Sequence, residues 1–415
     1  MQNKILSLGL TAILAALGVT LLITGTRAAG QTEIVLYNFG ERSTDGNDPE
    51  TSLIFDAAGN LYGTTSSGGA YGYGTVFELT PSSRGGWTET VLHNFGDGKD
   101  GSTPYAGLIL DTAGDLYGTT FKGGAYGLGT AFELSPQGDG RWAEKLLHSF
   151  GNGNDGSGPY ASLIFDRSGN LYGTTVSGGA HAFGTVFELM PKSEGGWTEK
   201  TLHSFNDTGR DGCDPFASLV LDSAENLYGT TEYCSPYNGG IVFELLPNTN
   251  GSWSEKVIHT FDYTDNYDGL NPDAGLVLDA AGNLYGTTVG GGYTGGGTVF
   301  ELLPQANGLW KKVQLRNFGS GKYDALGPRA GVIFDASGNL YGTTVEGGLY
   351  AEGTVFKLTP AAGRSWTETI LHDFGGGTDG AYLDGGVIFD AAGNLYGTTV
   401  VGGTFSEGTV FRITP

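Results

Sequence analysis

The sequence contains few basic residues and none of the common short motifs of hydrolases. Lysine and arginine together number 21, against 44 aspartates and glutamates, so the net charge is −23. A surface of this charge repels nucleic acid and attracts cations, and we exclude nucleic acid as a partner. The sequence also lacks Gly-x-Ser-x-Gly, His-Glu-x-x-His and a phosphate-binding loop. Enzymes that depend on these motifs are therefore excluded.

The first 28 residues differ from the rest of the chain. Lys4 is followed by an uncharged stretch from Ile5 to Thr26, and small residues then surround Arg27. This order is typical of a signal peptide, here cleaved after Ala28. Residues 5–23 are also long enough to cross a bilayer as a helix, so a retained N-terminal anchor over residues 1–28 is the alternative. Both interpretations place the remainder outside the cytoplasm (secreted, periplasmic or at the cell surface) and confine membrane contact to residues 5–26.

Cysteine occurs only twice, at Cys213 and Cys234. No cysteine near the N-terminus is available for lipid attachment, which excludes a lipoprotein anchor. An even number of cysteines in an exported chain predicts a disulfide between them.

Long helix-forming runs are absent after the N-terminus, whereas glycine is abundant, with 75 residues. The stretch Gly59-Asn60-Leu61-Tyr62-Gly63-Thr64-Thr65 returns six more times almost unchanged, beginning at Gly114, Gly169, Glu225, Gly282, Gly338 and Gly393. The units recur every 55–57 residues. Seven units of this period indicate a repeat array or propeller, because each unit is too small to bury a core alone.

Each unit contains four strand candidates, which in the second unit are residues 106–110, 116–120, 130–134 and 142–150. The last unit ends before its fourth strand, and residues 32–39 at the front of the chain match the missing one. We therefore predict an all-β fold for residues 29–415. It is a seven-bladed β-propeller with four antiparallel strands per blade, closed by the N-terminal strand 32–39.

Three sets of residues repeat in register, and we assign them to structure. Aspartates equivalent to Asp56 close the first strand and are expected to cap the turn that follows. Six tryptophans occupy one position, with Gln31 as the seventh member, and five histidines share one position in the outer strand. Their regular recurrence indicates packing rather than chemistry.

The combination of Gly-Asn-Leu-Tyr-Gly-Thr-Thr with the later Gly-Gly and Gly-Thr-Val-Phe-Glu-Leu resembles the GloVer tandem-repeat family of exported bacterial proteins, described as "choice-of-anchor". The resemblance covers essentially residues 32–415, and a more distant one links the chain to NHL and gluconolactonase-like propellers. It implies an extracytoplasmic, surface-associated protein and no catalytic residues. The sequence departs from the family pattern in lacking a C-terminal anchor segment, which leaves residues 5–26, if they are not cleaved, as the one segment that could act as a tether.

The predicted propeller places the loop between the second and third strands on the same face as the loop leading to the next blade. Both loops are long, glycine-rich and variable, and such loops on a rigid scaffold are common binding sites. Cys213 and Cys234 lie in these two loops of the fourth blade, which supports the disulfide.

Seven aspartates recur in the loops between blades: Asp45, Asp100, Asp155, Asp211, Asp268, Asp324 and Asp379. Most precede glycine, an ordinary turn pair. Seven carboxylates at one height would nevertheless form an acidic rim that attracts cations such as Ca²⁺. The spacing is not that of the Asp-x-Asp-x-Asp-Gly calcium loop, so we predict no cofactor and keep Ca²⁺ as the alternative.

One position departs from the repeat, immediately before the innermost strand. It holds Glu50, Tyr105, Tyr160, Phe216, Asp273, Arg329 and Asp384. Around a central pit, aromatic rings on three consecutive blades could stack on a sugar while the charged half binds its hydroxyls. Tyr126 and His181, in the glycine-rich loops, extend this predicted ligand-binding surface. Loop variation under weak constraint would produce the same pattern and is the alternative explanation.

We therefore predict an exported, monomeric, non-catalytic binding module, whose partner is a polysaccharide or a surface protein on the long-loop face. The alternative is an enzyme acting on a carbohydrate or a lactone, with Glu50, Asp273 and Asp384 as acid/base groups or metal ligands. Such an enzyme needs two carboxylates about 5–10 Å apart at the axis. A third interpretation is a scaffold whose repeats serve only shape.

Overall fold

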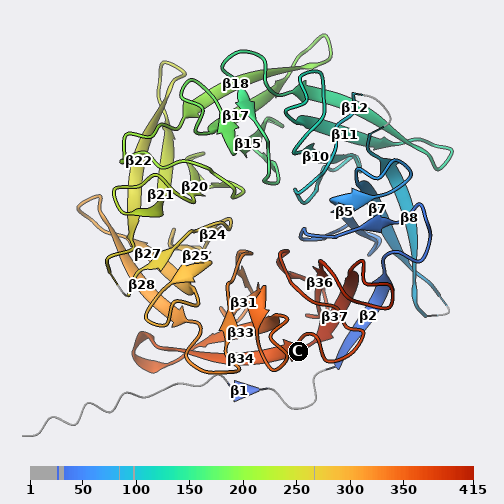
Figure 1. The fold of residues 1–415 in the computed structure, drawn as a ribbon. Helices are drawn as coiled ribbons and strands as arrows, with labels where there is room; N and C mark the ends of the chain where they lie inside the picture. The colour runs from blue at the N-terminus through green and yellow to red at the C-terminus, as the bar shows by residue number, and fades with distance from the viewer. Residues whose placement is uncertain (1–25, 28–31, 84, 97–98, 266) are drawn as a thin grey trace, which may run out of the picture.

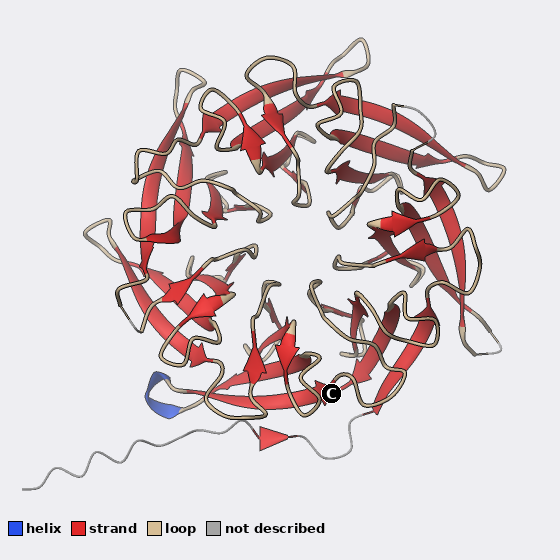
Figure 2. Ribbon diagram, in the orientation of Figure 1, coloured by secondary structure: helices blue, strands red, loops and turns tan. Residues whose placement is uncertain are grey.

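Seven β-sheets surround a central axis in the computed structural model, which describes residues 26–27, 32–83, 85–96, 99–265 and 267–415 (Figure 1). Each blade has four antiparallel strands, arranged side by side in order from the axis to the periphery. Within these residues, helix is confined to one 3-10 turn, Ala362–Arg364 (Figure 2). The predicted seven-bladed β-propeller is confirmed. None of the described helices is long and apolar enough to cross a membrane, and the signal or anchor predicted for residues 1–28 lies almost entirely outside the described part of the chain.

The blades follow one another in chain order, with the innermost strand first. Blade 1 contains β4 (Ile54–Phe55), β5 (Leu61–Thr65), β7 (Thr75–Pro81) and β8 (Trp87–Asn94). Blade 2 contains β9 (Ile109–Leu110), β10 (Leu116–Thr120), β11 (Thr130–Pro136) and β12 (Trp142–Ser149). Blade 3 contains β14 (Ile164–Phe165), β15 (Leu171–Thr175), β17 (Thr185–Pro191) and β18 (Trp197–Ser204).

The remaining blades repeat this arrangement. Blade 4 contains β19 (Val220–Leu221), β20 (Leu227–Thr231), β21 (Asn238–Pro247) and β22 (Trp253–Asp262). Blade 5 contains β24 (Val277–Leu278), β25 (Leu284–Thr288), β27 (Thr298–Pro304) and β28 (Trp310–Asn317). Blade 6 contains β30 (Ile333–Phe334), β31 (Leu340–Thr344), β33 (Thr354–Pro360) and β34 (Trp366–Asp373), with β1 (Thr26–Arg27) added in parallel at its edge.

Blade 7 joins the two ends of the chain. Its strands are β35 (Ile388–Phe389), β36 (Leu395–Thr399), β37 (Thr409–Thr414) and β2 (Thr32–Asn38). β2 pairs antiparallel with β37, so the start of the chain lies beside its end (Figure 1). The predicted closure by strand 32–39 is confirmed. Gln31, expected at the seventh tryptophan position, is outside the described residues.

The innermost strands are shorter than the sequence predicted. In blade 2 only Ile109 and Leu110 form the ladder, whereas residues 106–110 were expected. The carbonyl of Ala106 accepts a hydrogen bond from Thr64 of the preceding blade, 2.9 Å away, so it is satisfied without a strand neighbour. All seven blades repeat this bond, which links each second strand to the next blade: Thr64–Ala106, Thr119–Ala161, Thr174–Ala217, Thr230–Ala274, Thr287–Ala330, Thr343–Gly385 and Thr398–Thr51.

Each residue of the Leu-Tyr-Gly-Thr-Thr motif has a separate structural role. A Cβ at Gly63 would lie 2.6 Å from the ring of Phe77, so no larger residue fits there. The hydroxyl of Tyr62 donates to Glu78 and to Asp56 at 2.9 and 3.2 Å. Thr65 hydrogen-bonds Thr75 on the third strand at 2.9 Å. These bonds explain why the motif is repeated with so little change.

The loops on one face of the ring are paired with each other. In blade 1, β3 (Gly46–Asn47) pairs with β6 (Ser67–Gly68), and three further blades form the same ribbon: β13 (Gly156–Ser157) with β16 (Ser177–Gly178), β23 (Gly269–Leu270) with β26 (Gly290–Gly291), and β29 (Ala325–Leu326) with β32 (Glu346–Gly347). The loop entering a blade and the loop between its second and third strands therefore lie on the same face, as predicted.

At the fourth blade this pairing is covalent. Cys213 and Cys234 form the predicted disulfide, with their Cα atoms 5.2 Å apart, and Cys213 also forms a backbone bridge with Tyr233.

Removing this disulfide is expected to lower the stability of the propeller. The bond spans 21 residues, and the chain-entropy model gives roughly 3 kcal/mol for closing a loop of that size. We expect Cys213→Ser/Cys234→Ser to unfold at lower urea concentration, with an m-value equal to or above that of wild type because its unfolded state is less compact. Reductant should shift wild type to the same midpoint and leave the double variant unaffected. A double variant as stable as oxidised wild type would contradict the prediction.

Candidate functional site

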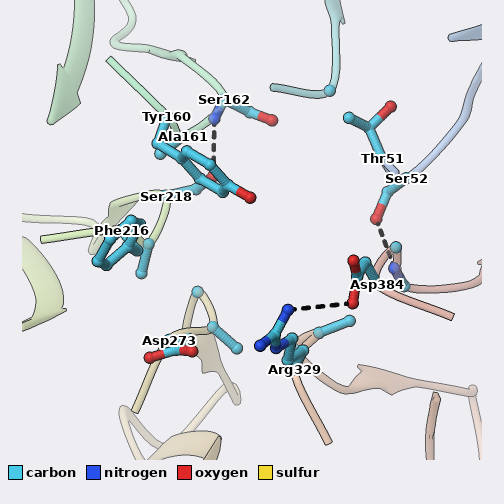
Figure 3. Close-up of a pocket in the computed structure, with 18 of the residues that line it drawn as sticks. Thr51, Ser52, Tyr160, Ala161, Ser162, Phe216, Ser218, Asp273, Arg329 and Asp384 are labelled. Carbon is cyan, nitrogen blue, oxygen red and sulfur yellow. Dashed lines mark hydrogen bonds and ion pairs between the residues drawn. The ribbon is translucent and has the colours of Figure 1, made fainter. Parts of the chain in front are cut away.

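The seven non-repeating residues converge on one cavity at the axis. The cavity has a volume of about 320 Å³, and its lining includes Glu50, Tyr105, Tyr160, Phe216, Asp273, Arg329 and Asp384. These side chains stand where each blade's innermost segment begins. We call this cavity the axial pocket. Figure 3 shows Tyr160 and Phe216 on one side of it and Arg329 with Asp384 on the other.

The aromatic half of the axial pocket is a continuous run of ring contacts. Tyr105 and Tyr160 are stacked, with centroids 4.8 Å apart and planes at 26°, and Phe216 meets Tyr160 edge-on at 5.2 Å. Phe121 supports both tyrosines, with centroids 5.6 and 6.1 Å from theirs. This support fixes ring faces that are each only partly buried. Fixed, exposed ring faces suit stacking on a sugar or another flat apolar surface.

The charged half has more carboxylates than cations. Arg329 lies 3.5 Å from Asp384, and Ser66 donates to Glu50 at 2.9 Å. Oδ1 of Asp273 is buried and has no hydrogen-bond partner within the described parts of the chain. Glu232 also lines the pocket. Four carboxyl groups therefore face one guanidinium.

Burial shifts the pKa of these carboxyl groups upward. Burial raises the pKa of Glu50 to about 7, and the nearby Asp384 adds to the increase although the Ser66 hydrogen bond opposes it. Burial also raises the pKa of Asp273 to about 7, with a further contribution from Glu232. The pKa of Asp384 rises for the same reason, against the opposing charge of Arg329. Carboxyl groups with such pKa values can accept or donate a hydrogen bond near neutral pH.

Small residues form the floor of the axial pocket. Oγ of Ser52 accepts a hydrogen bond from the backbone amide of Gly386, 2.9 Å away, across the junction of the first and last blades. Ser218 accepts from the amide of Ser162 at 3.1 Å (Figure 3). A Cβ at Gly107 would lie 3.0 Å from Oγ of Ser162. Seven backbones approach so closely here that only alanine, glycine, serine and threonine line the floor.

Two residues predicted for the binding surface lie elsewhere. Tyr126 is 51% exposed and His181 is exposed, and neither lines the axial pocket. Both lie in loops between the second and third strands of their blades. The structure therefore separates a central pocket from a peripheral set of loop side chains.

The seven loop aspartates do not form the acidic rim that the sequence suggested. They are largely buried, and each contacts the outer strand of its own repeat: Tyr37–Asp45, His93–Asp100, His148–Asp155, His203–Asp211, His259–Asp268, Arg316–Asp324 and His372–Asp379. Their carboxylates also accept backbone amides, as Asp155 does from Gly151 at 2.8 Å. The ring is thus seven separate polar clusters between blades, because each loop folds its carboxylate inward against its own strand.

Sequence reasoning missed Glu232, which lines the axial pocket, and Phe121, which packs against its two tyrosines. Both follow directly after a Leu-Tyr-Gly-Thr-Thr copy, where the other units hold serine or valine. This second break in the repeat could have been read from the sequence. Its closeness to the first break depends on how the loops fold over the axis.

The model of the Gloeobacter/Verrucomicrobia repeat matches residues 83–267 and 252–415. No curated protein matches the chain. A provisionally assigned 6-phosphogluconolactonase from Bacteroides uniformis is 14% identical, with a TM-score of 0.51 over 81% of this chain and 88% of that one. An ancestral GH74 enzyme is 11% identical, with a TM-score of 0.56 over 94% of this chain and 50% of its own. At these identities the structural similarity shows the fold alone.

Proposed function

The chain belongs to the Gloeobacter/Verrucomicrobia repeat family, and we propose that this member is an extracytoplasmic, non-catalytic module that binds a polysaccharide in its axial pocket. The observation that carries this proposal is the convergence on one cavity of the position before each innermost strand, where the seven repeats differ. Side chains that merely vary under weak constraint have no reason to sort into an aromatic half and a charged half. The disulfide supports a location outside the cytoplasm.

The chemistry of the pocket suits a sugar without acidic groups. The stacked Tyr105 and Tyr160 offer a flat apolar surface, and the opposite wall offers carboxyl oxygens and the Arg329 guanidinium for hydroxyls. Four carboxyl groups against one cation disfavour a uronic acid or a sulfated sugar. We therefore infer that the ligand is neutral or carries an amine.

Affinity electrophoresis of residues 29–415 tests the proposal. Wild type should be retarded by a neutral or amine-bearing polysaccharide and not by an acidic one. We expect Tyr160→Ala to weaken the retardation at least about 10-fold in apparent Kd, because it removes a stacking surface worth on the order of 1–3 kcal/mol. Tyr126→Ala, which truncates an exposed tyrosine outside the pocket, is the matched control.

The outcomes separate the pocket from the loops. Equal binding by Tyr160→Ala and wild type, with loss in Tyr126→Ala, would move the site to the peripheral loops. No retardation by any polysaccharide would contradict the proposal and favour a surface protein as the partner.

An enzyme acting on a carbohydrate or a lactone is the second candidate, and one observation favours it. Glu50 and Asp273, whose pKa values burial raises to about 7, are suited to act as general acids near neutral pH. New reducing ends in the same mixtures, lost in Asp273→Asn, would establish this activity. Binding without new reducing ends would support the non-catalytic module.

A further inference from the structure

The seven polar clusters between blades share one plan. Each blade junction consists of a residue of one outer strand, the loop aspartate that follows it, and the residue two positions after the repeated tryptophan position on the next outer strand. The junctions are Tyr37/Asp45/Glu89, His93/Asp100/Glu144, His148/Asp155/Glu199, His203/Asp211/Glu255, His259/Asp268/Lys312, Arg316/Asp324/Glu368 and His372/Asp379/Glu33.

Three of these junctions contain a permanent cation. Lys312 replaces the glutamate of its junction and forms an ion pair with Asp268. Arg316 replaces the histidine and bridges two carboxylates, at 2.6 Å from Asp324 and 2.8 Å from Glu368. In the first junction Arg42 lies 3.4 Å from Glu89. Three of the seven junctions therefore hold a positive charge beside their carboxylates, and a different residue position supplies it in each.

The junction between blades 3 and 4 has the same carboxylates and no such cation. His203, Asp211 and Glu255 each offer one ligand atom there, and these atoms lie within 4.8 Å of one another. Oε1 of Glu255 is buried and accepts no hydrogen bond from the described residues. The lysines on the two outer strands pair with other carboxylates. Lys200 lies 4.0 Å from Glu188, and Lys256 lies 3.2 Å from Glu244.

Asp211 and Glu255 bring two carboxylates together at this junction, and among the described residues no lysine or arginine forms an ion pair with them. Burial and the adjacent Asp211 carboxylate raise the pKa of Glu255. Nε2 of His203 is 2.9 Å from Asp211, and the Asn206 side chain also donates to Asp211. Either a proton or a bound cation must offset the two carboxylates.

We propose that His203, Asp211 and Glu255 bind one divalent transition-metal ion that joins blades 3 and 4. One imidazole nitrogen and two carboxylate oxygens form a mixed nitrogen and oxygen set, which suits Zn²⁺ better than Ca²⁺. Three protein ligands leave one position for water. The ion would occupy the place that Lys312 and Arg316 fill at the next two junctions.

The position of this site gives it a structural role. Asp211 lies two residues before Cys213, so the metal would hold the loop entering blade 4 close to the point where the disulfide fixes it. Because Zn²⁺ binds carboxylates and neutral imidazole, protons compete with it at these ligands, and binding would therefore weaken in acid.

Zn²⁺ titration of an untagged, EDTA-stripped chain tests the proposal. We expect calorimetry to give one ion per chain and the Tm to rise by several degrees. Glu255→Gln should weaken Zn²⁺ binding at least 10-fold. Glu199→Gln, at the equivalent position of the preceding junction, is the matched control and should retain one site.

A second variant uses the substitution already present in the chain. Glu255→Lys copies the Lys312 junction, so we expect it to fold in EDTA with a Tm at or above that of stripped wild type and to show no response to Zn²⁺. No Zn²⁺ binding by folded wild type, or undiminished binding by Glu255→Lys, would overturn the proposal.

Discussion

Deleting residues 29–39 together with the N-terminal segment is expected to abolish folding of the propeller, whereas deleting residues 1–28 alone leaves it intact. β2 is the outer strand of blade 7 and pairs with β37 over its length. Phe39, which follows β2, is fully buried and meets Phe77 of blade 1 with ring centroids 5.1 Å apart. Loss of this strand would expose the edge of β37 and open the core between the first and last blades.

Thermal unfolding followed by circular dichroism, with size-exclusion chromatography, measures this effect. The longer deletion should give no cooperative transition and should aggregate. Phe39→Ala, which keeps the strand and removes the ring, should cost about 3–5 kcal/mol. A longer deletion that melts cooperatively near the wild-type temperature would show that the ring does not need this closure.

Acidification from pH 8 to pH 5 is expected to stabilise the protein by about 2.5 kcal/mol through Glu50 and Asp273, even though most proteins gain little in this range. Burial raises the folded-state pKa of Glu50 and Asp273 from 4.5 and 3.8 to about 7. A group whose pKa is higher in the folded state binds its proton more tightly when folded. Stability therefore rises as the pH falls from about 7 toward the unfolded pKa values. The figure is about half of the unscreened sum for these groups, since both are partly exposed.

The stability gained on acidification is lost again in stronger acid. Asp268 has a pKa of about 2, because hydrogen bonds and charges from His259 and Lys312 outweigh its burial. The stability from this group is lost as the pH falls below about 4 toward its folded pKa. We therefore expect an optimum near pH 5 rather than a continuous rise.

Calorimetry in EDTA between pH 4 and pH 8 measures the slope. Asp273→Asn should raise the Tm at pH 8 and flatten the dependence, because it removes a buried charge with an unsatisfied oxygen. Asp207→Asn changes an exposed carboxylate and is the control. A Tm that falls steadily from pH 8 to pH 5 would contradict this prediction.

The sequence predicted the architecture because the same set of strand patterns recurs seven times. The Leu-Tyr-Gly-Thr-Thr copies fixed the number of blades, and the unmatched strand at the front of the chain identified the closure. The disulfide was predicted in the same way, because the repeat places both cysteines in loops of the fourth blade that open on the same face. The break before each innermost strand also identified all seven members of the axial pocket, since the fold brings equivalent positions of a ring to equal distances from its axis.

The tertiary structure decided where side chains point and what they meet. The loop aspartates, which the sequence allowed to form an open rim, fold inward against the outer strands that precede them. Five of them meet a histidine there, and the partly buried imidazole and the carboxylate satisfy each other. The glutamate that completes each junction comes from the next blade. His203 and Glu255 are 52 residues apart in the sequence and meet only because neighbouring outer strands lie side by side. Repetition within one chain reveals which positions are equivalent. Contacts between non-equivalent positions depend on how the loops pack, and they can be seen only in the folded structure.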